Sequence, residues 1–96
     1  MELVLIARFH AREGCEEAVA ATLKEQVPRV RLEPECRSIN SYRSKRDPRL
    51  FFIYSLWADE AAFNVHAELP NTVAFVARME ELIDHPFEAN RTVEIA

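Results

Sequence analysis

The chain has 96 residues, of which 49% are hydrophobic and 29% are charged, with 12 Lys or Arg against 16 Asp or Glu. That length predicts one domain over residues 1–96, and the hydrophobic share is ample for a core. A net charge of -4 argues against nucleic-acid binding, which needs a clustered basic face. No apolar run approaches the roughly 20 residues that span a bilayer, and the run over residues 3–7 is too short for a secretory signal. We therefore expect a cytoplasmic protein without membrane contact.

The first third of the chain predicts a strand followed by a helix. Residues 3–9 form a short Leu-, Ile- and Val-rich run that is typical of a strand, and Gly14 then breaks the chain. From Cys15 onward, apolar residues recur at helical spacing opposite a charged face. Pro28 is expected to end or kink this helix, because it lacks the N–H and crowds the preceding turn. The apolar stripe consists of Val19, Leu23, Val27 and Val30.

The middle of the chain predicts a hairpin. A polar strand at about residues 36–44 precedes a strongly apolar one at residues 50–57. Asp47-Pro48 lies between them and favours a turn. The two strands are therefore expected to pair.

Two helices and a strand are expected to complete the fold. Asp59 is a good N-cap for a short helix that reaches His66, and Pro70-Asn71 begins another, with Asn71 as its candidate cap. The final segment alternates apolar and polar residues, as a half-buried strand does. Its apolar positions are Phe87, Ala89, Val93 and Ile95. The element order predicts a ferredoxin-like α+β fold, with the helices on one face of an antiparallel sheet.

The apolar strand over residues 50–57 carries hydrophobic side chains on both of its faces. Leu50, Phe52, Tyr54 and Leu56 point one way, and Phe51, Ile53 and Trp57 point the other. A two-layer sandwich needs only one apolar face, so the second face would form a large exposed patch unless something covers it. We expect a second copy of the same sheet to be that cover, which makes the chain a homodimer.

With these elements placed, the sequence resembles the antibiotic biosynthesis monooxygenases and the related quinol monooxygenases, a family of dimeric α+β barrels. The residues that carry the resemblance are the segments 33–36 (Glu-Pro-Glu-Cys), 43–48 (ending in Asp-Pro), 50–57 (ending in Trp), 58–63 (with Asp and Ala-Ala) and His66. Four positions depart from the family pattern. Glu35 stands where Gly is usual and Ile39 where Tyr is frequent. Ser55 stands where Glu is common, and Asn71 where many relatives carry a second His.

The resemblance implies a cofactor-independent oxygenation of a quinol or another phenolic aromatic small molecule. Dioxygen would be the co-substrate, with no flavin, haem or metal. The alternatives are an isomerase of small carbonyl compounds that uses the same pocket, and a dimer that binds a small molecule without catalysis.

His66 is the predicted catalytic residue. It lies about two turns into the short helix that Asp59 caps, and an imidazole can act as acid or base near neutral pH. The competing interpretation is a buried His that hydrogen bonds a backbone carbonyl. Trp57 is expected to form a wall of the pocket, although a large aromatic residue is more often simply buried. Weaker candidates for substrate binding are Phe9, Asn40, Tyr42, Phe52 and Tyr54.

No metal site is predicted. The three His are far apart in sequence and form no pattern with Cys or Asp. His10 is expected to be solvated at the end of its strand, and His85 to serve a structural role at a helix C-terminus. Cys15 and Cys36 are expected to be reduced thiols, because no local redox motif surrounds them.

Overall fold

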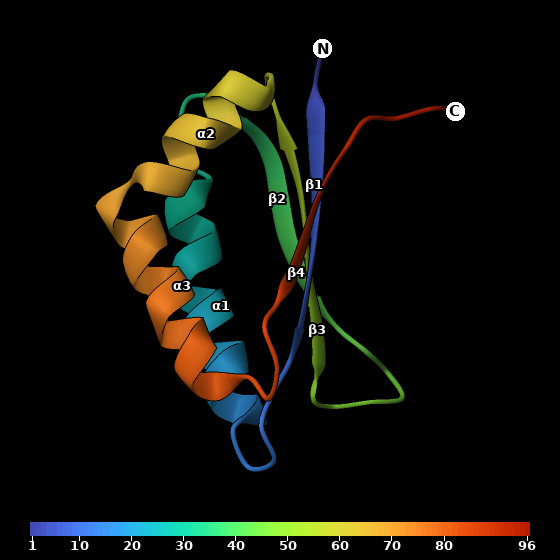
Figure 1. The fold of residues 1–96 in the computed structure, drawn as a ribbon, viewed down its shortest axis with the longest axis vertical. Coiled ribbons are helices and arrows are strands. Elements are labelled where there is room, and N and C mark those ends of the chain that lie inside the picture. Colours follow the sequence, from blue (N-terminus) through green and yellow to red (C-terminus); the bar gives the residue numbers. More distant parts are fainter.

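The computed structural model describes residues 1–96 as one antiparallel sheet with three helices on a single face (Figure 1). The elements are β1 (Leu3–His10), α1 (Glu16–Val30), β2 (Cys36–Arg43), β3 (Leu50–Trp57), α2 (Glu60–Glu68), α3 (Pro70–Leu82) and β4 (Glu88–Thr92). The strand order across the sheet is β2-β3-β1-β4. This is the ferredoxin-like α+β fold that the sequence predicts, and the prediction is confirmed.

The pairing of β1 with β3 decides which side chains form the core. Leu3 lies opposite Trp57, and Phe9 lies opposite Phe51. Because side chains alternate along a strand, the odd-numbered residues of both strands face the helices. There they meet the apolar stripe of α1, in which Val19 is fully buried.

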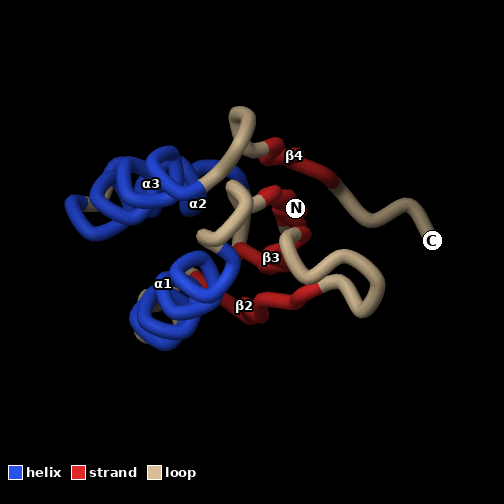
Figure 2. Tube along the Cα trace, turned by 90° about the horizontal axis from the view of Figure 1, so that it is seen from below, coloured by secondary structure: helices blue, strands red, loops and turns tan.

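The other face of the sheet has no helix over it, as the edge-on view shows (Figure 2). We call it the open sheet face. It carries apolar side chains that are exposed or half-buried, namely Ile6, Tyr42, Leu50, Phe52, Tyr54 and Leu56. The β2–β3 turn and the C-terminal segment also project on this side (Figure 2). The sequence therefore predicted the two-sided strand correctly.

Helix α1 departs from the sequence prediction at Pro28, which neither ends nor interrupts it. The proline lacks the N–H that would donate to the Lys24 carbonyl, so the helix loses this single hydrogen bond and continues to Val30. Val27 and Val30 on either side of it are buried, and Arg31 donates its backbone N–H to the Val27 carbonyl at 3.1 Å. Packing of this turn therefore outweighs the loss of helix stability that Pro28 causes.

Before the other end of α1, Gly14 has φ +86°, which glycine adopts without strain.

The two short helices begin differently. The Asp59 carboxylate accepts a hydrogen bond from the Ala62 backbone N–H at 2.8 Å, so the predicted cap of α2 is present. Helix α3 begins at Pro70, and Leu69 is its cap position, with no side-chain hydrogen bond. The prediction that Asn71 caps it was wrong, because proline is already suited to the first helical position and Asn71 falls inside the helix.

Strand β4 is shorter than its alternating pattern predicts. Pairing with β1 ends at Thr92, which faces Val4. Beyond it, Val93 is 48% exposed and Ile95 is 96% exposed. The chain leaves the sheet here (Figure 1), so these two apolar residues are not half-buried within the chain.

None of the three helices combines the length and the apolar character that a membrane-crossing helix needs.

The core assignment predicts unequal effects of truncation along α3. Met79 is 0% exposed and Val73 is 55% exposed. Met79→Ala should lower the free energy of unfolding by about 2–5 kcal/mol, because it leaves a cavity. Val73→Ala should change it by less than about 0.5 kcal/mol. Urea denaturation followed by circular dichroism measures both, and equal effects would contradict the assignment.

Candidate functional site

A cavity of about 370 Å³ lies between the sheet and the helices. Its walls come from all four strands and all three helices, and most of the residues that line it are hydrophobic. A few polar side chains interrupt this lining, namely Gln26, Ser55, His66, Thr72 and Arg91. An apolar cavity with a small number of polar groups is the usual form of a small-molecule site.

His66 lies on α2 and is 9% exposed. Its ring packs on the indole of Trp57, with the ring centroids 4.4 Å apart, and on Phe63 at 5.4 Å. Asp59 positions this residue indirectly, because it caps the helix two turns earlier. The imidazole is therefore held at the cavity by packing on both the sheet and its own helix.

Glu33 is the hydrogen-bonding partner of His66. The His66 Nδ1 atom lies 2.9 Å from Oε1 and 3.0 Å from Oε2 of the Glu33 carboxylate. A carboxylate can only accept, so Nδ1 carries the hydrogen and Nε2 of the neutral ring keeps a lone pair. The hydroxyl of Thr72 lies 3.4 Å from the same Nδ1. A carboxylate that fixes the tautomer and orientation of an imidazole is the arrangement that prepares a general base.

The segment that carries Glu33 is fixed by the backbone. Glu33 donates its N–H to the Val30 carbonyl at 3.0 Å, which continues the end of α1. Two residues later, the Glu35 carbonyl accepts from the Ala58 N–H at 3.1 Å. The loop between α1 and β2 is thus tied to the residue that follows β3 and leads into α2, the helix that carries His66 in its last turn.

Two further polar groups border the cavity. Gln26 on α1 is only 6% exposed and lines the cavity, and no hydrogen bond within the chain occupies its side chain. Arg91 on β4 donates to Glu60 at 2.8 Å and to Asn64 at 2.6 Å. Its guanidinium lies over the Phe63 ring, 5.0 Å from the centroid. Arg91 therefore links β4 to α2 at the cavity wall.

Three of the residues proposed from the sequence lie together at this site. His66 and Phe9 line the cavity, and Trp57 lies directly against the His66 ring. The indole N–H of Trp57 donates to the Ser55 hydroxyl at 3.0 Å, so the ring is fixed in place. Trp57 packs against the imidazole and does not line the cavity itself, so the expectation that it forms a wall of the pocket is corrected.

The other four residues proposed from the sequence lie elsewhere. Tyr42, Phe52 and Tyr54 project from the open sheet face, as their registers in the sheet require. Asn40 is exposed on β2 and accepts a hydrogen bond from Arg31 at 2.9 Å. The expectation that these four line the pocket with His66 is corrected, because strand alternation places them on the opposite side of the sheet.

Sequence reasoning missed the polar groups around His66. Glu33 was noted only as the first residue of the segment 33–36 that carries the family resemblance, with no role at the site, and Gln26 and Thr72 carried no motif. One signal pointed to Thr72, since it lies six residues after His66 with a helix break at Leu69 and Pro70 between them. The bend at this break lets a residue just after it face one just before it, as Thr72 faces His66.

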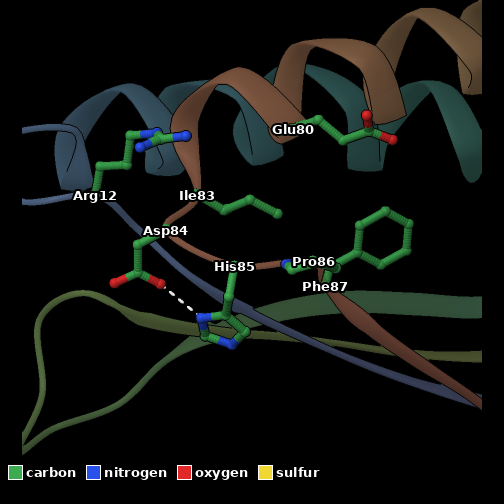
Figure 3. Close-up of a pocket in the computed structure, with 7 residues that line it drawn as sticks. All are labelled: Arg12, Glu80, Ile83, Asp84, His85, Pro86 and Phe87. Carbon is green, nitrogen blue, oxygen red and sulfur yellow. Dashed lines mark hydrogen bonds and ion pairs between the residues drawn. The ribbon is translucent and has the colours of Figure 1, made fainter.

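A second group of titratable side chains lies at the opposite end of β1. His10 Nδ1 is 2.7 Å from Asp84 Oδ2, and His10 Nε2 is 3.0 Å from Asp47 Oδ2. The hydrogen bond with Asp84 and, after it, that with Asp47 raise the pKa of His10 above its ordinary value. His85 lies next to Asp84 at the edge of a hollow of about 500 Å³ that Arg12, Glu80 and Phe87 also line (Figure 3). Both ring nitrogens of His10 therefore have hydrogen-bonding partners. The expectation that His10 is simply solvated was wrong.

Comparison with known proteins agrees with this architecture. The family model described as antibiotic biosynthesis monooxygenase matches residues 3–78. The solved structure of Rv0793 from Mycobacterium tuberculosis is 23% identical, with a TM-score of 0.93 over 100% of this chain and 97% of that chain. SO0527 from Shewanella oneidensis is 27% identical, with a TM-score of 0.89 over 95% of this chain and 88% of that chain. PA3566 from Pseudomonas aeruginosa is 26% identical, with a TM-score of 0.90 over 99% of this chain and 95% of that chain. No curated protein matches the sequence.

The position of Glu33 predicts the behaviour of a nearby thiol. Burial, and after it the charge of Glu33, raise the pKa of Cys36 above its ordinary value. Glu33→Gln removes the charge and should lower that pKa, so Cys36 should react faster with iodoacetamide at mildly alkaline pH. Mass spectrometry of the Cys36 peptide over time measures the rate. The exposed neighbour Glu35 provides the control, because Glu35→Gln should leave the rate nearly unchanged; equal acceleration in both variants would contradict the geometry.

Proposed function

Because this chain belongs to the antibiotic biosynthesis monooxygenase family, we propose that it is a cofactor-independent monooxygenase of quinols or other phenolic aromatic small molecules. The observation that carries the proposal is the His66 imidazole, held by Glu33 through Nδ1 at the wall of an apolar cavity. The Nε2 atom is left as the basic nitrogen of the site. His66 is the proposed catalytic residue, and Glu33 is its positioning residue.

The first step is removal of a proton from the substrate. A phenol or quinol bound in the cavity gives its proton to His66 Nε2, and the charge of Glu33 stabilises the imidazolium that forms. The substrate becomes an electron-rich anion in apolar surroundings. The Gln26 amide and the Arg91 guanidinium, which both line the cavity, are the groups available to its oxygen atoms.

The second step is the reaction of this anion with dioxygen. The anion transfers electrons to dioxygen, and a carbon–oxygen bond forms to give a peroxide anion. This anion takes back the proton held on His66 Nε2 and becomes a hydroperoxide, which returns the imidazole to its neutral form. Loss of water then breaks the O–O bond, leaving one oxygen atom in the product and releasing the other as water. The substrate supplies all four electrons in this balance, so no flavin, haem, metal or external reductant is required.

The size of the cavity limits the substrate. A volume of about 370 Å³ is near the lower end of the range of about 300–1,000 Å³ for small-molecule sites. Aromatic side chains of Phe9, Phe63 and Phe75 contribute to its lining. A flat molecule of one or two fused rings therefore suits it better than a large polycyclic compound.

The proposed functional form is a homodimer joined through the open sheet face. Ile6 is 41% exposed, Tyr54 is 44% exposed, and the two are paired across β1 and β3 at the centre of this face. Burial of apolar surface contributes about 25 cal/mol per Å², so covering the neighbouring Leu50, Phe52 and Leu56 as well favours association. A second copy covers the whole face by symmetry, because each sheet offers the same patch.

Oxygen uptake tests the catalytic proposal. Chelator-treated protein should consume oxygen above the autoxidation rate with at least one hydroquinone or naphthol, in a panel that also contains the larger, three-ring anthrones. His66→Ala should lower kcat by about 10²–10⁴-fold, which is the usual contribution of a positioned base. Val65→Ala changes an exposed neighbour on the same helix and should retain activity.

The outcomes separate the alternatives. Equal uptake by wild type and His66→Ala would remove the imidazole from the reaction. Turnover of a carbonyl compound without oxygen uptake would favour an isomerase. Tight ligand binding without turnover, in both the wild type and His66→Ala, would favour a binding protein.

Glu33→Gln should lower kcat with little change in KM, because Glu33 does not line the cavity.

Sedimentation analysis tests the dimer. The wild-type chain should sediment as a dimer at micromolar concentration. Tyr54→Glu places a charge at the centre of the open sheet face and should give a monomer, whereas Val65→Glu on the exposed side of α2 should not. A wild-type monomer at that concentration would overturn the proposed interface.

A further inference from the structure

We propose that His10, Asp84 and His85 form a binding site for a divalent transition-metal ion, with zinc as the representative ion, away from the His66 cavity. One ligand atom from each of the three residues lies within 4.8 Å of the other two. Trp57, against which His66 packs, lies opposite Leu3, whereas His10 ends the same strand. Seven residues of β-strand separate Leu3 from His10, or about 23 Å. The site is therefore distinct from the proposed catalytic one.

Both imidazoles present the same nitrogen to a single carboxylate. His10 Nδ1 lies 2.7 Å from Asp84 Oδ2, and His85 Nδ1 lies 2.6 Å from Asp84 Oδ1. The two rings are nearly parallel, with centroids 6.0 Å apart and an interplanar angle of 28°. A metal ion between them would replace the two N–H donors that now point at Asp84, and it would gain two nitrogen ligands and one oxygen ligand.

Asp47 supplies the outer contact that such a site needs. Metal-binding His residues almost always donate their second ring N–H to a carboxylate or carbonyl group. His10 Nε2 lies 3.0 Å from Asp47 Oδ2, so its hydrogen remains bonded when Nδ1 binds the ion. Asp47 is itself fixed, because its Oδ1 accepts from the Arg49 backbone N–H at 2.9 Å.

The nearest cation, Arg49, leaves one carboxylate oxygen available. Its Nη2 lies 3.2 Å from Asp84 Oδ2, and its Nε donates to the Ala11 carbonyl at 2.9 Å. The guanidinium thus binds on the Oδ2 side and is anchored to the backbone. The oxygen that faces His85, Oδ1, has no contact with Arg49 and is the oxygen we assign to the ion.

The backbone already brings the three ligands together. The Asp84 N–H donates to the His10 carbonyl at 3.0 Å, and Ala11 forms a bridge with Ile83. The end of β1 is therefore joined to the loop after α3 without a metal. Little ordering is then needed on binding. The His85 side chain is 47% exposed, so solvent can provide the fourth ligand.

The donor set indicates the class of ion. Two imidazole nitrogens and one carboxylate suit zinc and its first-row neighbours, whereas calcium and magnesium prefer oxygen ligands. The ion would join the α3–β4 loop to β1. Because it would bind the folded chain only, it would also raise the thermal midpoint of unfolding.

Calorimetric titration of chelator-treated protein with zinc chloride tests the site. One zinc ion should bind per chain. Loss of an outer carboxylate partner usually weakens metal binding about 10–100-fold, so Asp47→Asn should fall in that range, and His85→Ala should weaken binding at least as much. Cobalt bound in place of zinc should give visible absorption of the intensity typical of four-coordinate cobalt with nitrogen ligands.

His66→Ala provides the matched control, because it removes a His at the other end of the sheet. It should bind zinc as the wild type does. The same affinity in His85→Ala and wild type, or a weakened affinity in His66→Ala, would overturn the proposal. His85 is exposed, so His85→Ala should test the site without disturbing the fold.

Discussion

The alternation of side chains along β3 is the constraint on which the rest of the structure depends. Its eight residues are almost all apolar, and the pleat must divide them between two faces. The register with β1 sends Phe51, Ile53 and Trp57 toward the helices and Phe52 and Tyr54 away from them. A shift of one residue would exchange the two sets. The register between β1 and β3 therefore determines both which side chains face the cavity and which form the open sheet face.

The site itself depends on a second constraint, which is the distance in sequence between its polar parts. Glu33 follows α1 and His66 lies on α2, and a contact of 2.9 Å joins them. A backbone hydrogen bond from Ala58, the residue after β3, to Glu35 in the loop after α1 holds the two segments side by side. The charged groups at the other end of the sheet are brought together in the same way, by the turn after β2 and the loop after α3. Each end of the sheet thus gathers polar side chains from segments that are remote along the chain.

The sequence predicted the elements and the fold because their signals are local or periodic. The stripe of α1, the Asp59 cap and the alternation of residues 50–57 each predict one element without knowledge of the others. The site was only partly predictable. His66 was found from its helix and from the family resemblance, whereas Glu33 required the tertiary structure. Asn40, Tyr42, Phe52 and Tyr54 were assigned to the pocket because alternation divides the residues of a strand between two faces but does not reveal which face lines the cavity.

The indole of Trp57 gives the site a property that none of its other residues has. It is the only tryptophan in the chain, and its ring lies 4.4 Å from the imidazole of His66. All tryptophan emission of the folded protein therefore originates beside the cavity, from a ring that is 1% exposed. The chain contains its own optical probe of this one location. A molecule entering the cavity, or a rearrangement of α2, would be registered by a chromophore already in place, without any label.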